Sequence, residues 1–374
     1  MSISLCNFSH IRPPHEHPQE KILEWIAKAH ARAEKNVHPG TQEEVFYERI
    51  KERLLKIGLG PSKIAKRGTH KEVLEDNWEE LSICPVSSTS KSSAVNMRSK
   101  YFDEAASQVF EQFYRSVEKL PSHLIHVTCT GYVAPSPAQK IVSQRNADCM
   151  VTNAYHMGCY ASIPAIRMGL GFFSGALNGV DIVHTELCSL HMNPLFHSPE
   201  QLVVQSLFGD GFIKYSLTNN KDSPRLEIKA VHEQIIPNSL EDMSWWAEEG
   251  GMKMTLSRDV PAVIAEALPS FFATLVKKAD LSEDKIKSEA LFAIHPGGPK
   301  IIDQIKEILA LKEHQIEYST EVLKSFGNMS SATLPHIWEK MLNDRKVMNG
   351  SYIVSMAFGP GLTICGTLFE VKGK

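Results

Sequence analysis

The 374-residue sequence lacks several features that would place it in a special class of protein. No run of 18 apolar residues occurs, because the nearest candidate, residues 163–183, is broken by Arg167, Asn178 and Asp181, so we expect no membrane span. Lys and Arg number 40 against 43 Asp and Glu, which argues against nucleic-acid binding. Seven cysteines without a CxxC pair indicate free thiols, with no metal site and no disulfide framework. Since the first residues also lack a signal-peptide pattern, we expect a cytoplasmic protein.

What is present fits a folded α/β chain of about two domains. The first 120 residues show mainly helical spacing, with a serine-rich loop at 82–99, and strands then alternate with helices, a pattern typical of an α/β protein. A polar turn cluster at 217–222 predicts two halves, 1–220 and 221–374. The predicted helices lie at 22–29, 46–55, 102–120, 137–144, 159–172, 199–207, 261–278, 299–311 and 334–342, and the predicted strands at 123–130, 149–155, 181–187, 212–217, 225–236, 291–294, 352–358 and 362–371.

Cys159 is a candidate nucleophile because it lies in a Gly-containing turn between a predicted strand and a predicted helix. A sulfur at a helix N-terminus is expected to have a lowered pKa, which favours the thiolate. The alternative is a packing cysteine of ordinary reactivity, as we expect for Cys149, Cys188 and Cys365.

His295 and Asn328 are further candidates, each with an ordinary structural alternative. His295 follows a predicted strand and precedes a Gly-Gly turn, and strand ends are where sites assemble in α/β folds. Asn328 follows Gly327 at a junction between two helices, where it could instead serve as a helix C-cap.

Together these three side chains suit carbon–carbon bond formation on thioesters. A cysteine can hold an acyl group covalently, and His and Asn can donate hydrogen bonds to the enolate that forms when a β-carboxylate leaves as carbon dioxide. A cysteine and a histidine alone would equally fit a cysteine protease, so the surrounding motifs decide.

Those motifs resemble the type III polyketide synthases, which are chalcone synthase-like enzymes of the thiolase superfamily, in their bacterial form. The resemblance runs from residue 123 to the C-terminus. The matching motifs, in the family's order, are VTCTGYVAPSPA (127–138), MGCYASIPAIR (157–167), TELCS (185–189), SLFGDG (206–211), HPGGPKIIDQI (295–305), FGNMSSAT (326–333) and FGPGLTI (358–364).

The resemblance implies a five-layered αβαβα thiolase-like fold built from two similar halves, and it implies roles for individual residues. Cys159 matches the acyl-accepting nucleophile, while His295 and Asn328 match the residues that activate it and promote decarboxylation. For the substrate pocket it implies Phe208 as a gatekeeper, Gly359 and Pro360 in the turn near the reacting centre, and Cys129, Cys188, His191, Met254 and Ser330 in the wall.

Several pocket positions depart from the plant enzymes. Met254 stands where those enzymes have a second gate phenylalanine, and Cys129, Cys188 and His191 stand where they have threonines. A flexible methionine suits a longer starter, while an imidazole narrows and polarises the pocket. We therefore expect no flavonoid product.

Binding of coenzyme A is expected to involve cations of the segment LLKIGLGPSKIAKRGTH, although none aligns unambiguously with the family. Such cations could bind the phosphates of coenzyme A or of an acyl carrier protein, or simply form a solvated basic face. The candidates are Lys56, Lys63, Lys66 and Arg67.

The predicted function is that of an acyltransferase of secondary metabolism. An acyl starter loads onto Cys159, malonyl-CoA supplies two-carbon units by decarboxylative Claisen condensation, and the chain cyclises to a pyrone or resorcinol. We expect a homodimer and no cofactor beyond coenzyme A thioesters as substrates. The alternatives are a single-round β-ketoacyl synthase and a non-catalytic partner subunit of another condensing enzyme.

Overall fold

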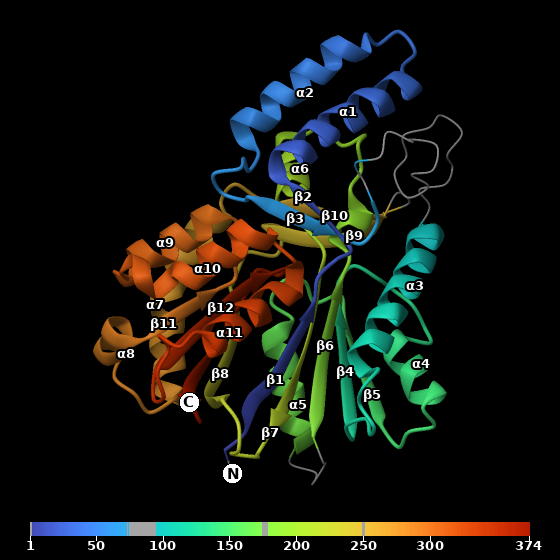
Figure 1. The fold of residues 1–374 in the computed structure, drawn as a ribbon. Helices are drawn as coiled ribbons and strands as arrows, with labels where there is room; N and C mark the ends of the chain where they lie inside the picture. The colour runs from blue at the N-terminus through green and yellow to red at the C-terminus, as the bar shows by residue number, and fades with distance from the viewer. Residues whose placement is uncertain (1, 73, 75–94, 174–178, 249–250) are drawn as a thin grey trace.

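The computed structural model describes residues 2–72, 74, 95–173, 179–248 and 251–374. Its main feature is a nine-stranded sheet with the order β11-β12-β13-β8-β1-β7-β6-β4-β5 (Figure 1). The strands are β1 (Ser4–Ile11), β4 (His123–Thr128), β5 (Met150–Tyr155), β6 (Val180–Glu186), β7 (Gly211–Thr218), β8 (Arg225–Ile235), β11 (Leu291–Ile294), β12 (Tyr352–Gly359) and β13 (Thr363–Lys372).

The sheet repeats one pairing pattern in its two halves. In the first half β4 is parallel to β6, β6 is antiparallel to β7, and β7 is antiparallel to β1. In the second half β11, β12, β13 and β8 follow the same sequence of parallel, antiparallel and antiparallel pairs. The two similar halves expected of the fold are thus present, and their strands form one continuous sheet, because Ser4 pairs with Glu227 and Leu5 with Leu226.

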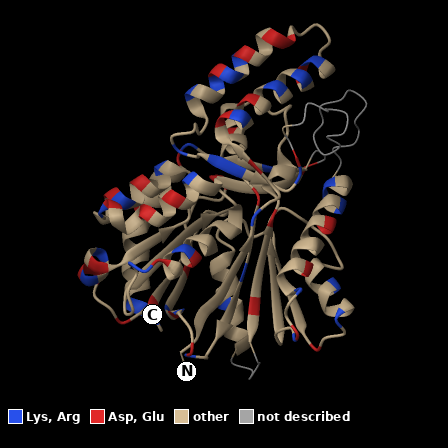
Figure 2. Ribbon diagram, viewed as in Figure 1, with Lys and Arg blue, Asp and Glu red and all other residues tan. Residues whose placement is uncertain are grey.

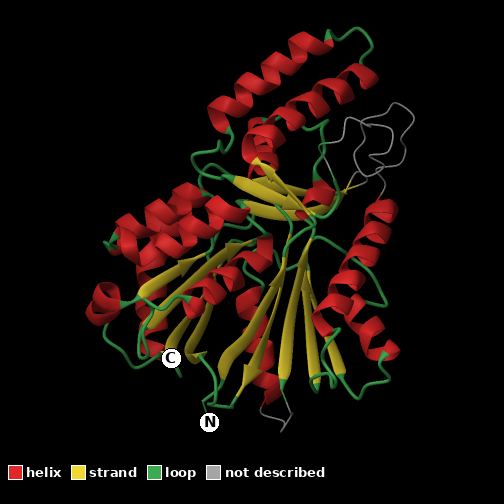
Figure 3. Cartoon of the chain, viewed as in Figure 1, coloured by secondary structure: helices red, strands yellow, loops and turns green. Residues whose placement is uncertain are grey.

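Helices cover both faces of the strands (Figure 3). Helix α5 packs on β4, β6 and β13, and helix α11 packs on β1, β7 and β11, so both lie between the two halves. Helices α3 and α4 cover the outer face of the first half, and α7 and α9 cover that of the second. This gives the predicted five layers. The bounds are α3 (Val95–Tyr114), α4 (Pro137–Gln144), α5 (Ser162–Phe173), α7 (Val260–Lys278), α8 (Glu283–Glu289), α9 (Pro299–Leu309), α10 (Glu313–Phe326) and α11 (Thr333–Asn343).

The composition of each element explains its layer. All seven residues of β6 are buried, as expected for a strand covered on both faces. Strands and central helices carry few charges, whereas the outer helices carry most of them (Figure 2). Trp338 of α11 illustrates the central layer: it is fully buried, and its indole N–H donates to the Ser355 hydroxyl at 2.7 Å.

A smaller layer lies over the end of the sheet at which the site forms. It contains the hairpin of α1 (Gln19–Val37) and α2 (Glu43–Ile57), together with α6 (Pro199–Leu207). Two ribbons lie beneath it, β2 (His15–Pro18) paired with β3 (Lys66–Thr69), and β9 (Met243–Glu248) paired with β10 (Gly251–Leu256). The apolar faces of α1 and α2 form a hydrophobic cluster of their own with Leu202 of α6.

The structure corrects two expectations about secondary structure. The first 120 residues contain β1, β2 and β3 in addition to helices, and β1 lies at the centre of the large sheet. Most of the predicted loop at 82–99 lies outside the described residues, and its last part, from Val95, is the first turn of α3. The sequence patterns also missed β9, β10 and α8, whereas the helix expected before Gly327 is α10.

Helix α7 is the one helix in the described part of the chain that is long and apolar enough to cross a membrane. Seven of its residues are buried, and it packs on β8 and β13, as the core helix of a globular protein does. The division into 1–220 and 221–374 stays a prediction.

Candidate functional site

Cys159 lies in the turn between β5 and α5, three residues before the helix begins. Gly158 makes this turn possible, because its φ is +86° and a Cβ there would lie 2.8 Å from the Pro360 Cδ. Cys159 lines a pocket, and the residue is 7% exposed.

Asn328 lies in the loop after α10 and is fixed through its backbone. Its N–H donates to the Leu207 carbonyl at 3.0 Å, and its carbonyl accepts the Gly209 N–H at 2.9 Å. The side-chain Oδ1 accepts the Ser330 N–H at 2.8 Å, which leaves the amide N–H₂ as donor. Gly327 caps α10 by donating to the Leu323 carbonyl at 2.9 Å, so Asn328 has more than a capping role.

His295 directly follows β11, and its N–H donates to the Met356 carbonyl at 2.8 Å. The residue is 1% exposed, and neither ring nitrogen has a hydrogen-bond partner within the described residues. Burial lowers the pKa of the imidazole to about 3, so the ring is neutral at physiological pH. The structure thus brings Cys159 and Asn328 into interaction, and no hydrogen bond joins His295 to either in the described part.

The expected lowering of the Cys159 pKa is wrong. Burial raises the pKa of this thiol to about 12, and the nearby carboxylate of Glu186 raises it further. Hydrogen bonds from Ser330 and Asn328 and from the backbone N–H of Cys159 lower the pKa, but these effects are smaller than the cost of removing the thiolate from water. The resting pair is therefore a neutral thiol and a neutral imidazole.

Ser330 connects Cys159 with a second thiol. The Ser330 hydroxyl lies 3.7 Å from the Cys159 sulfur and 2.8 Å from the Cys129 sulfur. The backbone of Ser330 has a φ of +50°, and this residue follows Asn328 and Met329 directly in the chain. A hydroxyl can donate to one sulfur while accepting from the other, so it can relay a proton between them.

Glu186 is the main residue that sequence reasoning missed. Its fully buried carboxylate accepts the Thr130 hydroxyl at 2.8 Å, the Cys129 N–H at 3.1 Å and the Ser331 hydroxyl. Burial raises its pKa. Glu186 lies within the TELCS motif, so the sequence marked this segment as part of the site. Only the fold shows that the carboxylate lies behind Cys129.

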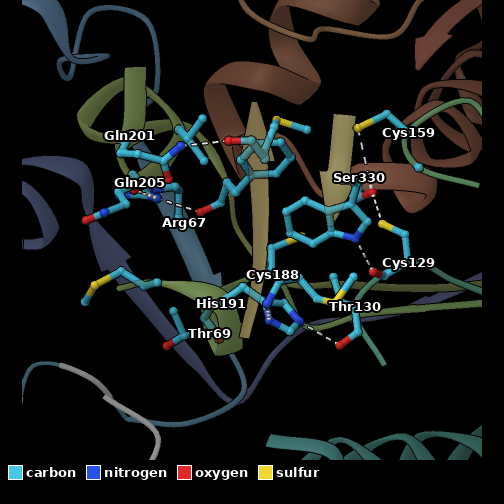
Figure 4. Close-up of a pocket in the computed structure, with 18 of the residues that line it drawn as sticks. Arg67, Thr69, Cys129, Thr130, Cys159, Cys188, His191, Gln201, Gln205 and Ser330 are labelled. Atoms are coloured by element: carbon cyan, nitrogen blue, oxygen red, sulfur yellow. Dashed lines mark hydrogen bonds between the residues drawn. The ribbon is translucent and has the colours of Figure 1, made fainter. Parts of the chain in front are cut away.

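The pocket contains about 1060 Å³ of empty space, counted out to its open mouth. Cys129, Cys159 and Ser330 lie on one side of it, and Gln201 and Gln205 of α6 lie on the other (Figure 4). Of the predicted pocket residues, the structure places these in the wall: Cys129, Cys188, His191, Phe208, Met254, Ser330 and Pro360.

Gly359 does not line the pocket. A Cβ at this position would lie 2.1 Å from the Tyr160 ring, so this glycine makes room for the residue after the nucleophile. Gly359 thus lies close to the Cys159 turn, as expected for a turn near the reacting centre, and its part in substrate binding stays a prediction.

His191 polarises the pocket less than expected, because both of its ring nitrogens have partners. The Met252 N–H donates to Nδ1 at 3.0 Å, and Nε2 lies 2.8 Å from the Thr130 carbonyl. A ring that accepts at Nδ1 and donates at Nε2 is neutral. Burial also lowers its pKa to about 3.

The four predicted coenzyme A ligands differ in accessibility. Arg67 is buried, and its guanidinium donates to the Gln19 side chain at 2.7 Å and to the Gln205 and Phe208 carbonyls at 2.8 and 2.6 Å. It therefore lies in the pocket wall and not at the surface where phosphates would dock, which contradicts its predicted role. Lys66 is exposed and pairs with Glu16 at 2.8 Å. Lys56 and Lys63 are exposed, and Lys63 lines a small second cavity beside Pro299 and Lys324.

Comparison with known sequences identifies relatives for most of the chain. Residues 227–372 match the family "Chalcone and stilbene synthases, C-terminal domain". Probable polyketide synthase 1 of Dictyostelium discoideum is 29% identical over 67% of this chain, but this covers only 8% of that protein. Type III polyketide synthase C of Arabidopsis thaliana is 27% identical over 71% of each chain. The alpha-pyrone synthesis polyketide synthase-like Pks18 of Mycobacterium tuberculosis is 29% identical, over 66% of this chain and 64% of its own.

Comparison with solved structures extends the similarity to the N-terminal residues. The C-terminal type III polyketide synthase domain of Steely1 from Dictyostelium superposes with a TM-score of 0.82 at 21% identity, over 99% of both chains. This similarity shows that the whole described chain, including the α1–α2 hairpin, has the same fold.

Proposed function

Because this chain is a homologue of the type III polyketide synthases, a family of acyltransferase-type condensing enzymes, we propose that it builds polyketides by decarboxylative condensation on Cys159. The observation that carries this proposal is the position of the Cys159 thiol, which opens into a large pocket with Asn328 and Ser330 beside it. A packing cysteine has no need of such a pocket.

In the proposed loading step, the sulfur attacks the carbonyl carbon of a starter thioester. The thiol proton passes to the neutral His295 imidazole as the carbon–sulfur bond forms, and the coenzyme A thiolate leaves and takes up that proton. The starter acyl group is then bound to Cys159. Since the pKa of this thiol is about 12, proton transfer has to accompany the attack.

In the proposed extension step, malonyl-CoA loses its carboxylate as carbon dioxide, and the electron pair of the broken bond forms an enolate. The Asn328 amide and the His295 ring N–H donate hydrogen bonds to the enolate oxygen. The enolate carbon attacks the acyl carbonyl, the new carbon–carbon bond forms, and Cys159 leaves as the thiolate. Release of carbon dioxide drives this chemistry, so the proposal includes no metal or redox cofactor.

We favour several rounds of extension over one, because the relatives are type III polyketide synthases and one of them is named for alpha-pyrone synthesis. A single-round β-ketoacyl synthase needs space for one two-carbon unit beyond its starter, whereas a chain that cyclises to a pyrone or resorcinol has to fold within the site. For delivery of the thioesters we propose coenzyme A, with the exposed Lys56, Lys63 and Lys66 near its phosphates, and an acyl carrier protein as the alternative.

The test is loading and extension by variants at the three positions. Cys159→Ala should form no acyl adduct by intact-mass measurement, whereas Cys149→Ala, which lies outside the pocket, should load normally. His295→Ala and Asn328→Ala should release carbon dioxide from malonyl-CoA at least about 100-fold more slowly. Products extended by one unit only would favour the β-ketoacyl synthase, and normal loading of Cys159→Ala would refute the assigned nucleophile.

A further inference from the structure

Helix α1 contributes one face to the pocket, although it belongs to the separate layer above the sheet. Ile22, Trp25 and Ile26 follow the spacing of one helix face, and all three line the cavity that contains Cys159. The same three side chains also belong to the hydrophobic cluster in which α1 packs on Ile50 and Leu54 of α2. The pocket therefore has an apolar roof that comes from outside the catalytic core.

Four methionine side chains also line the pocket and form a wall next to the α1 residues. They come from the segment before α6 and from the β9–β10 ribbon, and a thioether can adjust to chains of different shape. These residues are Met192, Met243, Met252 and Met254.

The polar groups of the same wall are mostly engaged with protein partners. Both nitrogens of His191 are used, and the Trp245 N–H donates to the Cys129 carbonyl at 2.7 Å. The Gln201 N–H₂ donates to the Met254 carbonyl at 2.7 Å. Arg67 and Thr69 also line the pocket, and the Arg67 Nη2 and the Thr69 hydroxyl have no partner in the described part, but these two atoms are themselves buried. A ligand that brings polar groups here would leave them unpaired, which disfavours it.

The roof is attached at two points, so its position relative to the pocket is fixed. Gln19, the first residue of α1, donates to the Leu59 and Ser206 carbonyls at 2.6 and 2.7 Å. Farther along the helix, His30 bonds to the Gln205 side chain at 2.6 Å and to the His197 ring at 2.8 Å. Because α6 is the partner at both points, we expect the distance between α1 and α6, and with it the width of the pocket, to be fixed.

From these observations we propose that the Ile22, Trp25 and Ile26 face of α1 is the surface that selects the starter, and that it binds the hydrocarbon tail of an aliphatic acyl thioester. This inference rests on the proposed function of Cys159. It assigns starter selection to a hairpin distant in sequence from the nucleophile, and it makes His30 and Gln205 positioning residues that act through α1.

The experiment compares acetyl-, hexanoyl-, lauroyl- and palmitoyl-CoA as starters, with loading on Cys159 and kcat/KM measured separately. Burial of the additional methylene groups favours binding, so kcat/KM should rise at least about tenfold from acetyl to lauroyl, mainly through KM. Ile26→Trp, which fills the pocket under the roof, should reduce loading by lauroyl-CoA at least about tenfold and that by acetyl-CoA less than about twofold. Lys21→Trp, the same substitution on the exposed side of α1, should change neither.

A second variant tests the inference independently, in case Ile26→Trp fails to fold. Ile22→Ala removes carbon atoms from the roof and should shift the preferred starter to a longer chain. Equal losses for all starters in both variants, or a wild-type preference for acetyl-CoA, would overturn the inference. If lauroyl groups load selectively on Cys159 but are never extended by malonyl-CoA, the starter assignment stands and the polyketide proposal fails. If Cys159 accepts no acyl group, both fail.

Discussion

Cys159 and His295 are both neutral in the resting site, since the pKa of the thiol is about 12 and that of the imidazole is about 3. Burial is the main cause in each case, and it acts in opposite directions because it disfavours the charged form of both groups. The nucleophile is thus protected from solvent reagents until a thioester enters the pocket and the proton can move.

This neutral pair predicts how Cys159 reacts with iodoacetamide. Only the thiolate reacts, so the alkylation rate should rise about tenfold per pH unit from about pH 6 to about pH 10 without levelling off. Mass spectrometry of the Cys159 peptide measures this rate, and Cys149, which is half-buried, serves as an internal reference. A plateau below about pH 8 would show a thiolate–imidazolium pair and contradict the structure.

Glu186 provides a second test at the same site. Its negative charge raises the pKa of Cys159, so Glu186→Gln should lower that pKa and speed alkylation at about pH 9 several-fold. The matched control is Glu186→Asp, which keeps the charge and should keep the slow rate. Slower alkylation in Glu186→Gln would mean that the carboxylate assists ionisation of the thiol.

The individual site residues differ in how far the sequence predicted them. Motifs identified the positions of Cys159, His295 and Asn328, because a strand, a tight turn and a helix are local patterns. They did not reveal Glu186 behind Cys129, or Arg67 buried under Phe208, because those contacts join residues over 50 positions apart. The raised pKa of Cys159 could not be predicted either, since burial depends on the whole fold.

Among the elements, β1 was missed although it lies at the centre of the large sheet. Its sequence, SLCNFSHI, mixes polar and apolar residues and has no clear alternation. Its place comes from pairing with β7 and β8, more than 200 residues away, and strand formation depends strongly on such partners. Helices α4 and α6 were predicted with their observed bounds because each begins with a local signal, a serine N-cap followed by proline.

The α1–α2 hairpin should depend on the buried His30. In His30→Ala the Gln205 oxygen and the His197 ring each lose a partner, and unpaired buried groups cost about 1–3 kcal/mol. Urea denaturation should show that loss of stability, and KM for a long-chain starter should rise because the roof is no longer fixed. Lys28→Ala, on the exposed side of the same helix, should stay within about 0.5 kcal/mol of wild type. Wild-type stability in His30→Ala would show that α1 is held by apolar packing alone.

At the scale of the whole molecule, the large sheet has a free edge at β5, which pairs only with β4 in the described part. Met150 at the start of β5 and Tyr132 nearby are each about half exposed. Exposed edges favour pairing with another chain, and a two-fold dimer would cover this one. Light scattering should give about twice the monomer mass of 41.8 kDa, and Met150→Asp should shift the protein toward monomer. An unaffected dimer in that variant would place the interface elsewhere.

Buried histidines should make the whole fold sensitive to mild acid. Burial lowers the pKa of five histidines to about 3. These are His30, His126, His191, His295 and His336. Their unfolded pKa is about 6.5, so between those values the unfolded chain binds more protons, and stability is lost as the pH falls below about 6.5. Each histidine contributes up to about 1.4 kcal/mol per pH unit in this range.

Buried carboxyl groups act in the opposite direction but are fewer. Burial raises the pKa of Asp210 to about 6, so its folded form binds more protons than its unfolded form between about pH 4 and pH 6. The histidines should prevail, and the melting temperature should fall from about pH 7.5 to about pH 5.5, with net proton uptake on unfolding. Calorimetry in buffers of different ionisation enthalpy measures that uptake, and His336→Gln should reduce it by about one proton. A melting temperature that stayed constant or rose over this range would show that these imidazoles are already protonated in the fold, and the neutral His295 on which the proposed loading step depends would then be wrong.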